Sequence, residues 1–362
     1  MREELKRRDL PALRSREEMR EVMQREVYGY LPQVDYTLSY DSPVSVERRY
    51  MCGRVEHSFV NLTVKVEERV HTFRVDRLLH VDGKKRPLVI FQNFAPISSS
   101  PYFPIEEMSE YEVDFLAFCY QDITTDNADF SNGLAVLLLP NGQERKDSCG
   151  KIAVWAWAAM RVLDYGLTLE GTDPNNIAIA GHSRLGKTAA FTAMMDERFR
   201  FAFSNAAGCT GDALSHGNSG HGKKHDPALR HQRGELISDI THKFPYWFCK
   251  NYLQYAEHDL SDCFDQHYLL ASIAPRYVMV GACSEDAWAD PVSQQLCALA
   301  AGEAWEQAGK LGLVDCDRLL EPGEGSIDGH VGFFKIYAKH FLSRHSWRWF
   351  IRFIEAHQDD PV

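Results

Sequence analysis

The spacing of hydrophobic residues changes along the chain, and each change predicts a different kind of element. Residues 1–30 are rich in charge and predict an N-terminal helix. Residues 58–66 and 72–79 alternate polar and apolar side chains, which is typical of antiparallel strands with one face in water. Later apolar runs are short and nearly continuous, at 87–91, 113–120, 176–180 and 276–281. Strands buried on both faces have this pattern, so these runs predict a parallel sheet.

Helical patterns fill the intervals between the later strands. Residues 151–165 are apolar almost all round, which predicts a buried crossover helix. Further helices are predicted at 185–195, 244–255, 265–273, 291–308 and 346–357. Antiparallel strands followed by strand–helix alternation is the order of an α/β-hydrolase. We therefore expect an α/β protein with a mostly parallel central sheet and helices on both faces.

We expect one domain with an insertion. Residues 1–80 should belong to the same domain as the α/β-hydrolase core at 81–362, and residues 212–234 should form an insertion loop near the candidate site of that core. That loop is polar and Gly-rich, and it carries His216, His221, His225 and His231. The histidine spacings match neither HExxH nor a cysteine-linked zinc pattern, so we expect a solvated loop, no metal and no cofactor.

Charge and cysteine usage narrow the partners. The net charge is −11 with acids and bases interspersed, so neither nucleic acid nor a membrane surface is expected as a partner. No stretch approaches the ~20 apolar residues of a membrane span. The nine cysteines form no CxxC pair, which favours a reducing compartment over a disulfide framework. Because the first residues also lack an apolar signal-peptide core, we expect a cytoplasmic location.

The strongest candidate for chemistry is Ser183. The apolar strand at 176–180 runs into Gly181-His182-Ser183, and a helix-forming segment follows at once. A nucleophile elbow has this arrangement, because a tight turn lifts the serine above the sheet and the next helix begins beside it with free N–H groups. The common pattern places a glycine two residues after the serine; here Leu185 stands there and Gly186 follows. The alternative is a serine that only caps the helix.

A serine nucleophile needs a histidine base and a carboxylate to orient it. In α/β-hydrolases the chain order is serine, acid, histidine. His340 follows the apolar run at 331–337, so it lies in the loop where the base belongs, and His330 is the alternative. Asp286 lies just beyond the strand at 277–282, where such sheets place functional groups. Glu285 and Asp290 are the alternatives for the acid.

The segment 181–187, Gly-His-Ser-Arg-Leu-Gly-Lys, is similar to the nucleophile motif of the glucuronoyl esterase family of carbohydrate esterases. The likeness continues in the expected order through segments that begin at Asp196, Ser204, Phe244, Phe264, Ile273 and Ser284, and it covers about residues 85–355. The resemblance implies a serine esterase that resembles 4-O-methyl-glucuronoyl methylesterases and acts on a small-molecule or oligosaccharide ester. An acetyl (xylan) esterase, or another α/β-hydrolase activity such as a serine peptidase, is the alternative.

The resemblance also implies roles for single residues. Of the family's two acid positions, one falls at Ala206, which leaves Asp286. The family uses the arginine after the nucleophile, here Arg184, to stabilise an oxyanion, and a permanent cation suits that role. Lys187 and Trp288 match its sugar contacts.

One part of the sugar site departs from the family pattern. The family carries a Gln and, eight residues later, a Glu before its Pro-Trp-Phe segment. Here Glu235 stands at the Gln position, as a substrate-binding candidate, and Lys243 stands near the Glu position. Exchanging an acceptor for a cation changes which ring hydroxyls find partners, so we expect weaker selection for glucuronate.

Overall fold

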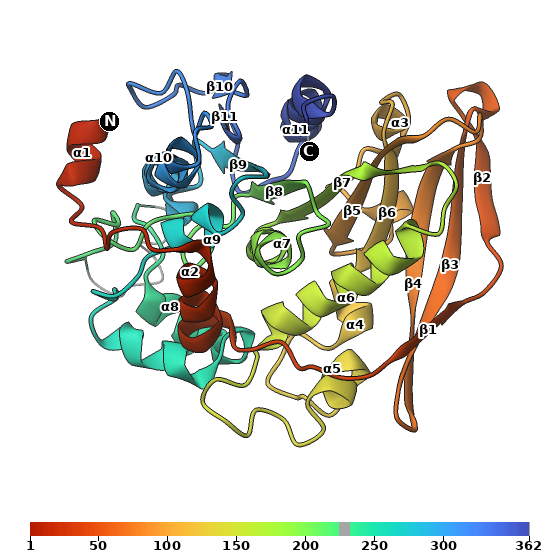
Figure 1. The fold of residues 1–362 in the computed structure, drawn as a ribbon, viewed down its shortest axis with the longest axis horizontal. Helices are drawn as coiled ribbons and strands as arrows, with labels where there is room; N and C mark the ends of the chain where they lie inside the picture. Colours follow the sequence, from red (N-terminus) through yellow and green to blue (C-terminus); the bar gives the residue numbers. More distant parts are fainter. Residues whose placement is uncertain (224–231, 362) are drawn as a thin grey trace.

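The computed structural model describes residues 1–223 and 232–361. Its strands are β1 Thr37–Tyr40, β2 Val44–Tyr50, β3 Val55–Val66, β4 Arg69–His80, β5 Arg86–Asn93, β6 Asp114–Cys119, β7 Thr172–His182, β8 Phe201–Asn205, β9 Tyr277–Cys283, β10 Gly325–Ser326 and β11 Val331–Ile336. Within the described ranges they form one eleven-stranded sheet in the order β1-β3-β4-β6-β5-β7-β8-β9-β11-β10, with β2 paired to β3 (Figure 1).

The sheet changes direction at one boundary. Strands β1 to β4 are antiparallel to their neighbours, and β4 also pairs antiparallel with β6. From β6 to β11 every pairing is parallel, and β10 closes the far edge as an antiparallel strand. The fold is therefore the α/β-hydrolase fold predicted from the sequence, and residues 37–80 extend the same sheet as the core.

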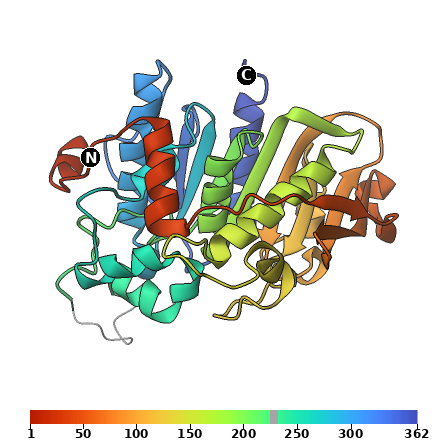
Figure 2. The same cartoon turned by 60° about the horizontal axis from the view of Figure 1, so that its bottom comes forward.

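Helices cover the sheet and connect its strands. They are α1 Arg2–Lys6, α2 Arg16–Met23, η1 Gln24–Tyr28, η2 Met51–Gly53, η3 Ile97–Ser99, α3 Ile105–Met108, α4 Tyr120–Ile123, α5 Gly133–Leu138, α6 Lys151–Gly166, α7 Arg184–Met195, α8 Ile237–Lys243, η5 Pro245–Trp247, η6 Lys250–Glu257, α9 His267–Ala271, η7 Ala287–Ala289, α10 Pro291–Gln307 and α11 Arg344–His357. Helices α6, α7, α9 and α10 lie on one face of the sheet, and α11 lies on the other (Figures 1 and 2).

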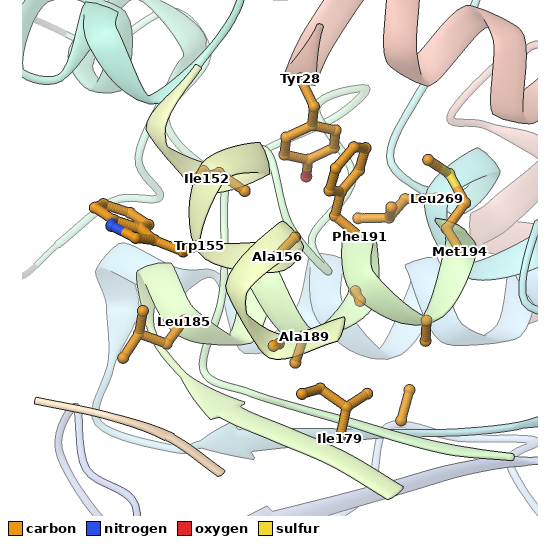
Figure 3. Packing of buried hydrophobic residues seen from close by; sticks show 14 of the residues in the cluster. Tyr28, Ile152, Trp155, Ala156, Ile179, Leu185, Ala189, Phe191, Met194 and Leu269 are labelled. Atoms are coloured by element: carbon orange, nitrogen blue, oxygen red, sulfur yellow. The ribbon is translucent and has the colours of Figure 1, made fainter. Parts of the chain in front are cut away.

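The alternation of side chains along each central strand produces two cores. Leu88 and Ile90 of β5 belong to the core beneath α6 and α7, whereas Val89 and Phe91 belong to the core beneath α11. All eight residues of β5 are buried, because helices cover both faces. Figure 3 shows part of the larger core, where the ring of Phe191 on α7 meets that of Tyr28 at 4.6 Å between centroids.

The prediction of one helix over residues 1–30 is wrong. Ser15 begins a separate helix, α2, since its side chain accepts a hydrogen bond from the N–H of Glu18 and the Glu18 carboxylate accepts one from the N–H of Ser15. Residues 7–15, which include Pro11, connect α1 to α2 without helical structure, and a five-residue π-helix, η1, follows α2. The capping box and the proline are the local signals that break the helix.

The predicted helix over 244–255 is also wrong. Helix α8 ends at Lys243, and Pro245 then opens a short 3₁₀ turn, η5, followed by a second 3₁₀ segment, η6. Proline has no N–H to continue the preceding helix, so the chain turns here. In the part of the chain that the structure describes, no helix has the length and apolar character needed to cross a membrane.

Candidate active site

The nucleophile candidate stands on a tight turn between β7 and α7. Ser183 has φ 59° and ψ −126°, a backbone conformation that residues other than glycine rarely adopt. The turn is possible because Gly181 lacks a Cβ, which would lie 2.0 Å from the carbonyl oxygen of Leu185. Gly186 in turn lets α7 approach Asn205 of β8. The local sequence therefore places Ser183 beyond the carboxyl end of β7, as the elbow pattern predicts.

Ser183, His340 and Asp286 form a hydrogen-bonded relay. The Ser183 Oγ lies 2.8 Å from His340 Nε2, and an Asp286 carboxylate oxygen lies 2.5 Å from His340 Nδ1. Strands β9 and β11 are parallel neighbours, so the loops that follow them leave the same edge of the sheet and bring the acid to the base. The Asp286 side chain is 6% exposed and that of His340 is 44% exposed. The candidate base is thus open to solvent, while the candidate acid is shielded from water.

The alternatives for base and acid lie elsewhere. His330 precedes β11, so it lies at the amino end of this strand, whereas Ser183 lies beyond the carboxyl end of β7. The His330 ring stacks on that of Tyr277, with 4.5 Å between centroids. Asp290 caps α10 and accepts hydrogen bonds from the N–H groups of Ser293 (3.2 Å) and Ser219 (2.8 Å). Glu285 is exposed. None of the three takes part in the relay.

The alternative acid position of the family holds no carboxylate. Ala206 is buried with φ 49°, and its N–H donates to the carbonyl of Gly281 at 2.7 Å. A buried carboxylate that no sequence pattern indicated, Asp212, lies in the same loop after β8 as Ala206. It accepts hydrogen bonds from Ser204 Oγ at 2.8 Å and from the N–H of Gly208 at 2.7 Å. These contacts give Asp212 a role in holding the loop after β8.

A second histidine packs against the base. The His182 ring centroid lies 4.6 Å from that of His340, and burial holds the pKa of His182 well below its usual value. The Asn205 side-chain N–H group lies 2.9 Å from His182 Nδ1 and also donates to the carbonyl of Phe341 at 3.2 Å. His182 therefore stays neutral and Asn205 ties it to the loop that carries the base. Sequence spacing offered no signal for this contact.

Arg184, the residue after Ser183, has a carboxylate partner that no sequence pattern indicated. Arg184 forms an ion pair with Asp126, which lies in the loop after α4. The Trp247 indole N–H donates to Asp126 Oδ1 at 2.7 Å, and the Tyr120 hydroxyl donates to Oδ2 at 3.0 Å. The guanidinium carbon lies 4.7 Å from the ring centroid of Trp247. The guanidinium of the residue that follows Ser183 is therefore held in place by charge and by aromatic faces.

The residues predicted to contact sugar are linked through Glu235. Lys187 is buried and donates to the carbonyl of Ala207. The N–H of Glu235 donates to the carbonyl of Trp288 at 2.9 Å. Burial raises the pKa of the Glu235 carboxyl to about 6 although nearby Lys187 opposes the rise, and burial lowers the pKa of Lys187. The structure therefore brings Lys187, Glu235 and Trp288 together.

The ring of Trp288 is supported from one face. The Arg233 guanidinium carbon lies 5.0 Å from the Trp288 ring centroid, and Arg233 donates to the Asp239 carboxylate at 2.6 Å. Lys243, by contrast, is exposed at the end of α8, with its Nζ 5.0 Å from the Phe244 ring centroid.

The expectation of a solvated His-rich loop is wrong for its first part. His216 is buried, and its Nδ1 lies 2.8 Å from the Asp265 carboxylate. His221 Nε2 lies 2.9 Å from the carbonyl of Ser215. The polar, Gly-rich composition predicted a solvent-exposed loop, but the Asp265 carboxylate provides a hydrogen-bond partner for His216 inside the protein. His225 and His231 lie outside the described residues. Among the residues described, no three His, Cys, Asp or Glu side chains gather as a metal site.

Solved structures share this fold. A promiscuous CE15 esterase from a marine bacterial metagenome superposes with a TM-score of 0.80 at 25% identity, covering 94% of this chain and 91% of that one. A glucuronoyl esterase from Solibacter usitatus also gives a TM-score of 0.80, at 24% identity and with the same coverage.

Sequence relatives point to the same group. Carbohydrate esterase MZ0003, from an unknown prokaryotic organism, is 33% identical over 238 residues, which are 65% of this chain and 51% of that protein. A 4-O-methyl-glucuronoyl methylesterase of Podospora anserina is 27% identical over 170 residues, 45% of this chain and 33% of that protein. The chain thus spans about half the length, or less, of these relatives.

Residues 64–309 match the family described as "Glucuronyl esterase, fungi". That segment contains β7, the elbow, α7 and the loop with Asp286, and it makes up more than half of the chain. The protein therefore belongs to the glucuronyl esterase family.

Proposed function

We propose that the protein is a serine carboxylic-ester hydrolase that acts on a carbohydrate ester, with an ester of a 4-O-methyl-glucuronic acid type as its substrate class. The observation that carries the proposal is the relay Ser183–His340–Asp286, with contacts of 2.8 and 2.5 Å. The family match and the curated relatives, among them 4-O-methyl-glucuronoyl methylesterases, support the choice of ester.

In the first half of the reaction, Ser183 Oγ attacks the ester carbon while His340 Nε2 takes its proton. Asp286, hydrogen-bonded to Nδ1, stabilises the imidazolium that results. The tetrahedral intermediate then collapses: the bond from carbon to the alcohol oxygen breaks, and His340 gives its proton to that oxygen. The alcohol leaves and the acid remains as an ester of Ser183.

In the second half, His340 takes a proton from water, and the oxygen of that water attacks the acyl carbon. The bond to Ser183 Oγ breaks, and His340 returns the proton to Oγ. In both halves negative charge develops on the carbonyl oxygen. The backbone N–H of Arg184, at the start of α7, has no partner within the helix, and the Arg184 guanidinium adds a permanent positive charge.

The first test is Ser183→Ala. We expect kcat on a good ester substrate to fall by about 10³-fold or more while circular dichroism stays unchanged. A fluorophosphonate probe should label the wild type and not the variant. If the variant kept more than about a tenth of the wild-type rate, Ser183 would not be the nucleophile.

The second test compares kcat/KM for a methyl glucuronate ester, the matching galacturonate ester and a simple acetyl ester. We expect measurable turnover of the glucuronate ester, with a preference over galacturonate below about 10³-fold. The reason is that Glu235 and Lys243 do not reproduce the Gln/Glu pair that would select particular hydroxyls. Brisk acetyl release without turnover of either uronate ester would replace the proposal with an acetyl esterase.

A further inference from the structure

Arg184 is held by a carboxylate whose every oxygen is engaged. Asp126 Oδ2 accepts from Arg184 Nη1 and from the Tyr120 hydroxyl at 3.0 Å, and Oδ1 accepts from the Trp247 indole at 2.7 Å. The backbone carbonyl of Asp126 accepts from the Tyr246 hydroxyl at 2.9 Å. These donors come from α4, α7 and η5, so the carboxylate is fixed from three directions.

The loop that carries Asp126 is also fixed at its base. The buried Lys151 Nζ donates to Thr124 Oγ1 and to the carbonyl of Asp129, both at 2.6 Å. Asn132 Oδ1 accepts from the N–H of Thr125 at 2.9 Å. Lys151 is the first residue of α6, so the loop is anchored to a buried helix and not to the surface.

The surroundings of the ion pair are apolar. The Arg184 guanidinium carbon lies 4.7 to 5.9 Å from four ring centroids, those of Trp247, Phe244, Phe94 and Tyr120. The Asp126 side chain is 8% exposed and that of Arg184 is 25% exposed. Charges interact more strongly where rings exclude water, so Asp126 limits the directions that the guanidinium can take.

One side of the guanidinium is unmatched. The Nε of Arg184 is buried and has no hydrogen-bond partner within the described part of the chain. Since Asp126 takes Nη1, the donor that lacks an acceptor belongs to a side chain whose direction is already set. Because that Nε is itself shielded, the donors left to meet charge that appears only during the reaction are those on Nη1 and Nη2 of a side chain that is 25% exposed.

We propose that Asp126 is a positioning residue, which fixes Arg184 so that its remaining N–H donors serve the oxyanion formed when Ser183 attacks the ester. The inference rests on the proposed esterase function and extends it to a residue outside the nucleophile segment. Asp126 does not touch the substrate; it acts through Arg184.

The charge of Asp126 has an opposite effect that makes the proposal testable. A carboxylate close to a developing oxyanion disfavours it by simple repulsion. If repulsion dominated, removing the charge would raise kcat. If positioning dominates, removing the charge frees Arg184 and lowers kcat, because small displacements of a catalytic group cost up to about 10²-fold.

The test uses Asp126→Asn, which keeps the shape and removes the charge, and Asp126→Glu, which restores a carboxylate. Asp164→Asn is the matched control, because Asp164 pairs with Arg161 at 2.7 Å, and the Arg161 guanidinium lies over the rings of Tyr36 and Trp157. That cluster is at the other end of α6, away from Ser183. All rates are expressed per site that reacts with a fluorophosphonate probe, so unfolded protein does not enter them.

We expect Asp126→Asn to lower kcat by about 10- to 100-fold with KM changed less than about threefold. Asp126→Glu should recover part of that loss, and Asp164→Asn should leave kcat unchanged. In an Arg184→Ala background, Asp126→Asn should cause no further loss, because its effect passes through Arg184. An unchanged or raised kcat, or the same loss with and without Arg184, would overturn the proposal.

A second variant covers the case in which Asp126→Asn does not fold. Trp247→Phe keeps a ring over the guanidinium but removes the N–H that holds Oδ1. We expect kcat to fall several-fold, and again only when Arg184 is present; an unchanged kcat would overturn the proposal. A wild-type protein that hydrolyses no ester and takes up no probe would refute the proposed function itself, which distinguishes the two failures.

Discussion

At the scale of single residues, the orientation of His340 depends on one buried acid. The Asp286 carboxylate holds the Nδ1 side of the ring at 2.5 Å, so the other nitrogen faces Ser183. Asp286→Asn keeps the shape but favours the wrong tautomer, as in other triads where this change costs about 10⁴-fold in kcat. We expect a fall of about 10³- to 10⁴-fold in steady-state kinetics. Glu285→Gln, an exposed neighbour on the same loop, is the control and should keep kcat within about twofold. A comparable loss in Glu285→Gln would contradict the assignment of the acid.

The stability of the protein should depend on pH through the Glu235 carboxyl. Burial raises its pKa from 4.5 to about 6, so between these values the folded protein holds a proton that the unfolded chain has lost. The contribution of this group to stability is therefore present below pH 4.5 and is lost as pH rises through about 6. Glutamine does not titrate, so the Tm of Glu235→Gln minus that of the wild type should increase between these two pH values. Differential scanning calorimetry at several pH values measures it, and a constant or decreasing difference would show that folding does not raise the pKa of Glu235.

Residues at strand ends could be predicted from the sequence, whereas residues brought in by loops could not. Ser183, Asp286 and His340 each follow an apolar run that reads as a buried strand, and parallel strands deliver their carboxyl ends to one edge. Asp126 stands in a polar loop and has no such signal. Its contact with Arg184 depends on how that loop folds back, which is a property of tertiary packing.

At the scale of elements, the strand–turn–helix unit of β7 and α7 depends on a glycine. A Cβ at Gly181 would lie 2.0 Å from the carbonyl oxygen of Leu185, which belongs to the backbone and cannot move aside. We expect Gly181→Ala to destabilise the fold by about 3 kcal/mol or more in urea unfolding and to abolish turnover in the folded fraction. Gly171→Ala is the control, since its Cβ would meet ordinary contacts of 3.6 Å and beyond. Equal stability of the two variants would contradict this account of the elbow.

Periodicity predicted the central elements better than the peripheral ones. The runs at 151–165 and 185–195 correspond to α6 Lys151–Gly166 and α7 Arg184–Met195, which are buried between strands and other helices. The prediction for the N-terminal segment was wrong because its high charge content was read as one helix, whereas Ser15 caps a new helix. Long buried helices carry a strong pattern, whereas short helices are decided by caps and prolines that an average over a window hides.

At the scale of the whole molecule, a shared core and an unbroken sheet show that the antiparallel strands belong to the same domain as the parallel strands. Val60, Leu62 and Val64 of β3 are buried in the same core as Ile179 of β7. The sheet has no break between β4 and β6, where Asp76 to Leu78 pair with Phe115 to Ala117. The first eighty residues therefore contribute to the same sheet and the same core as β7, the strand that precedes the turn at Ser183.

One side chain of the N-terminal segment reaches α7, the helix that follows Ser183. Tyr28 is fully buried, its ring lies 4.6 Å from that of Phe191 on α7, and its hydroxyl donates to the carbonyl of Thr210 at 2.7 Å (Figure 3). Removing such a ring leaves a cavity and an unpaired carbonyl, so Tyr28→Ala should lower the free energy of unfolding by about 3–5 kcal/mol in urea. Tyr40→Ala is the matched control on the sheet edge, where the side chain is 49% exposed, and it should cost about 1 kcal/mol or less. If both variants lost the same small amount, the N-terminal segment would be an appendage and not a part of the core that supports Ser183.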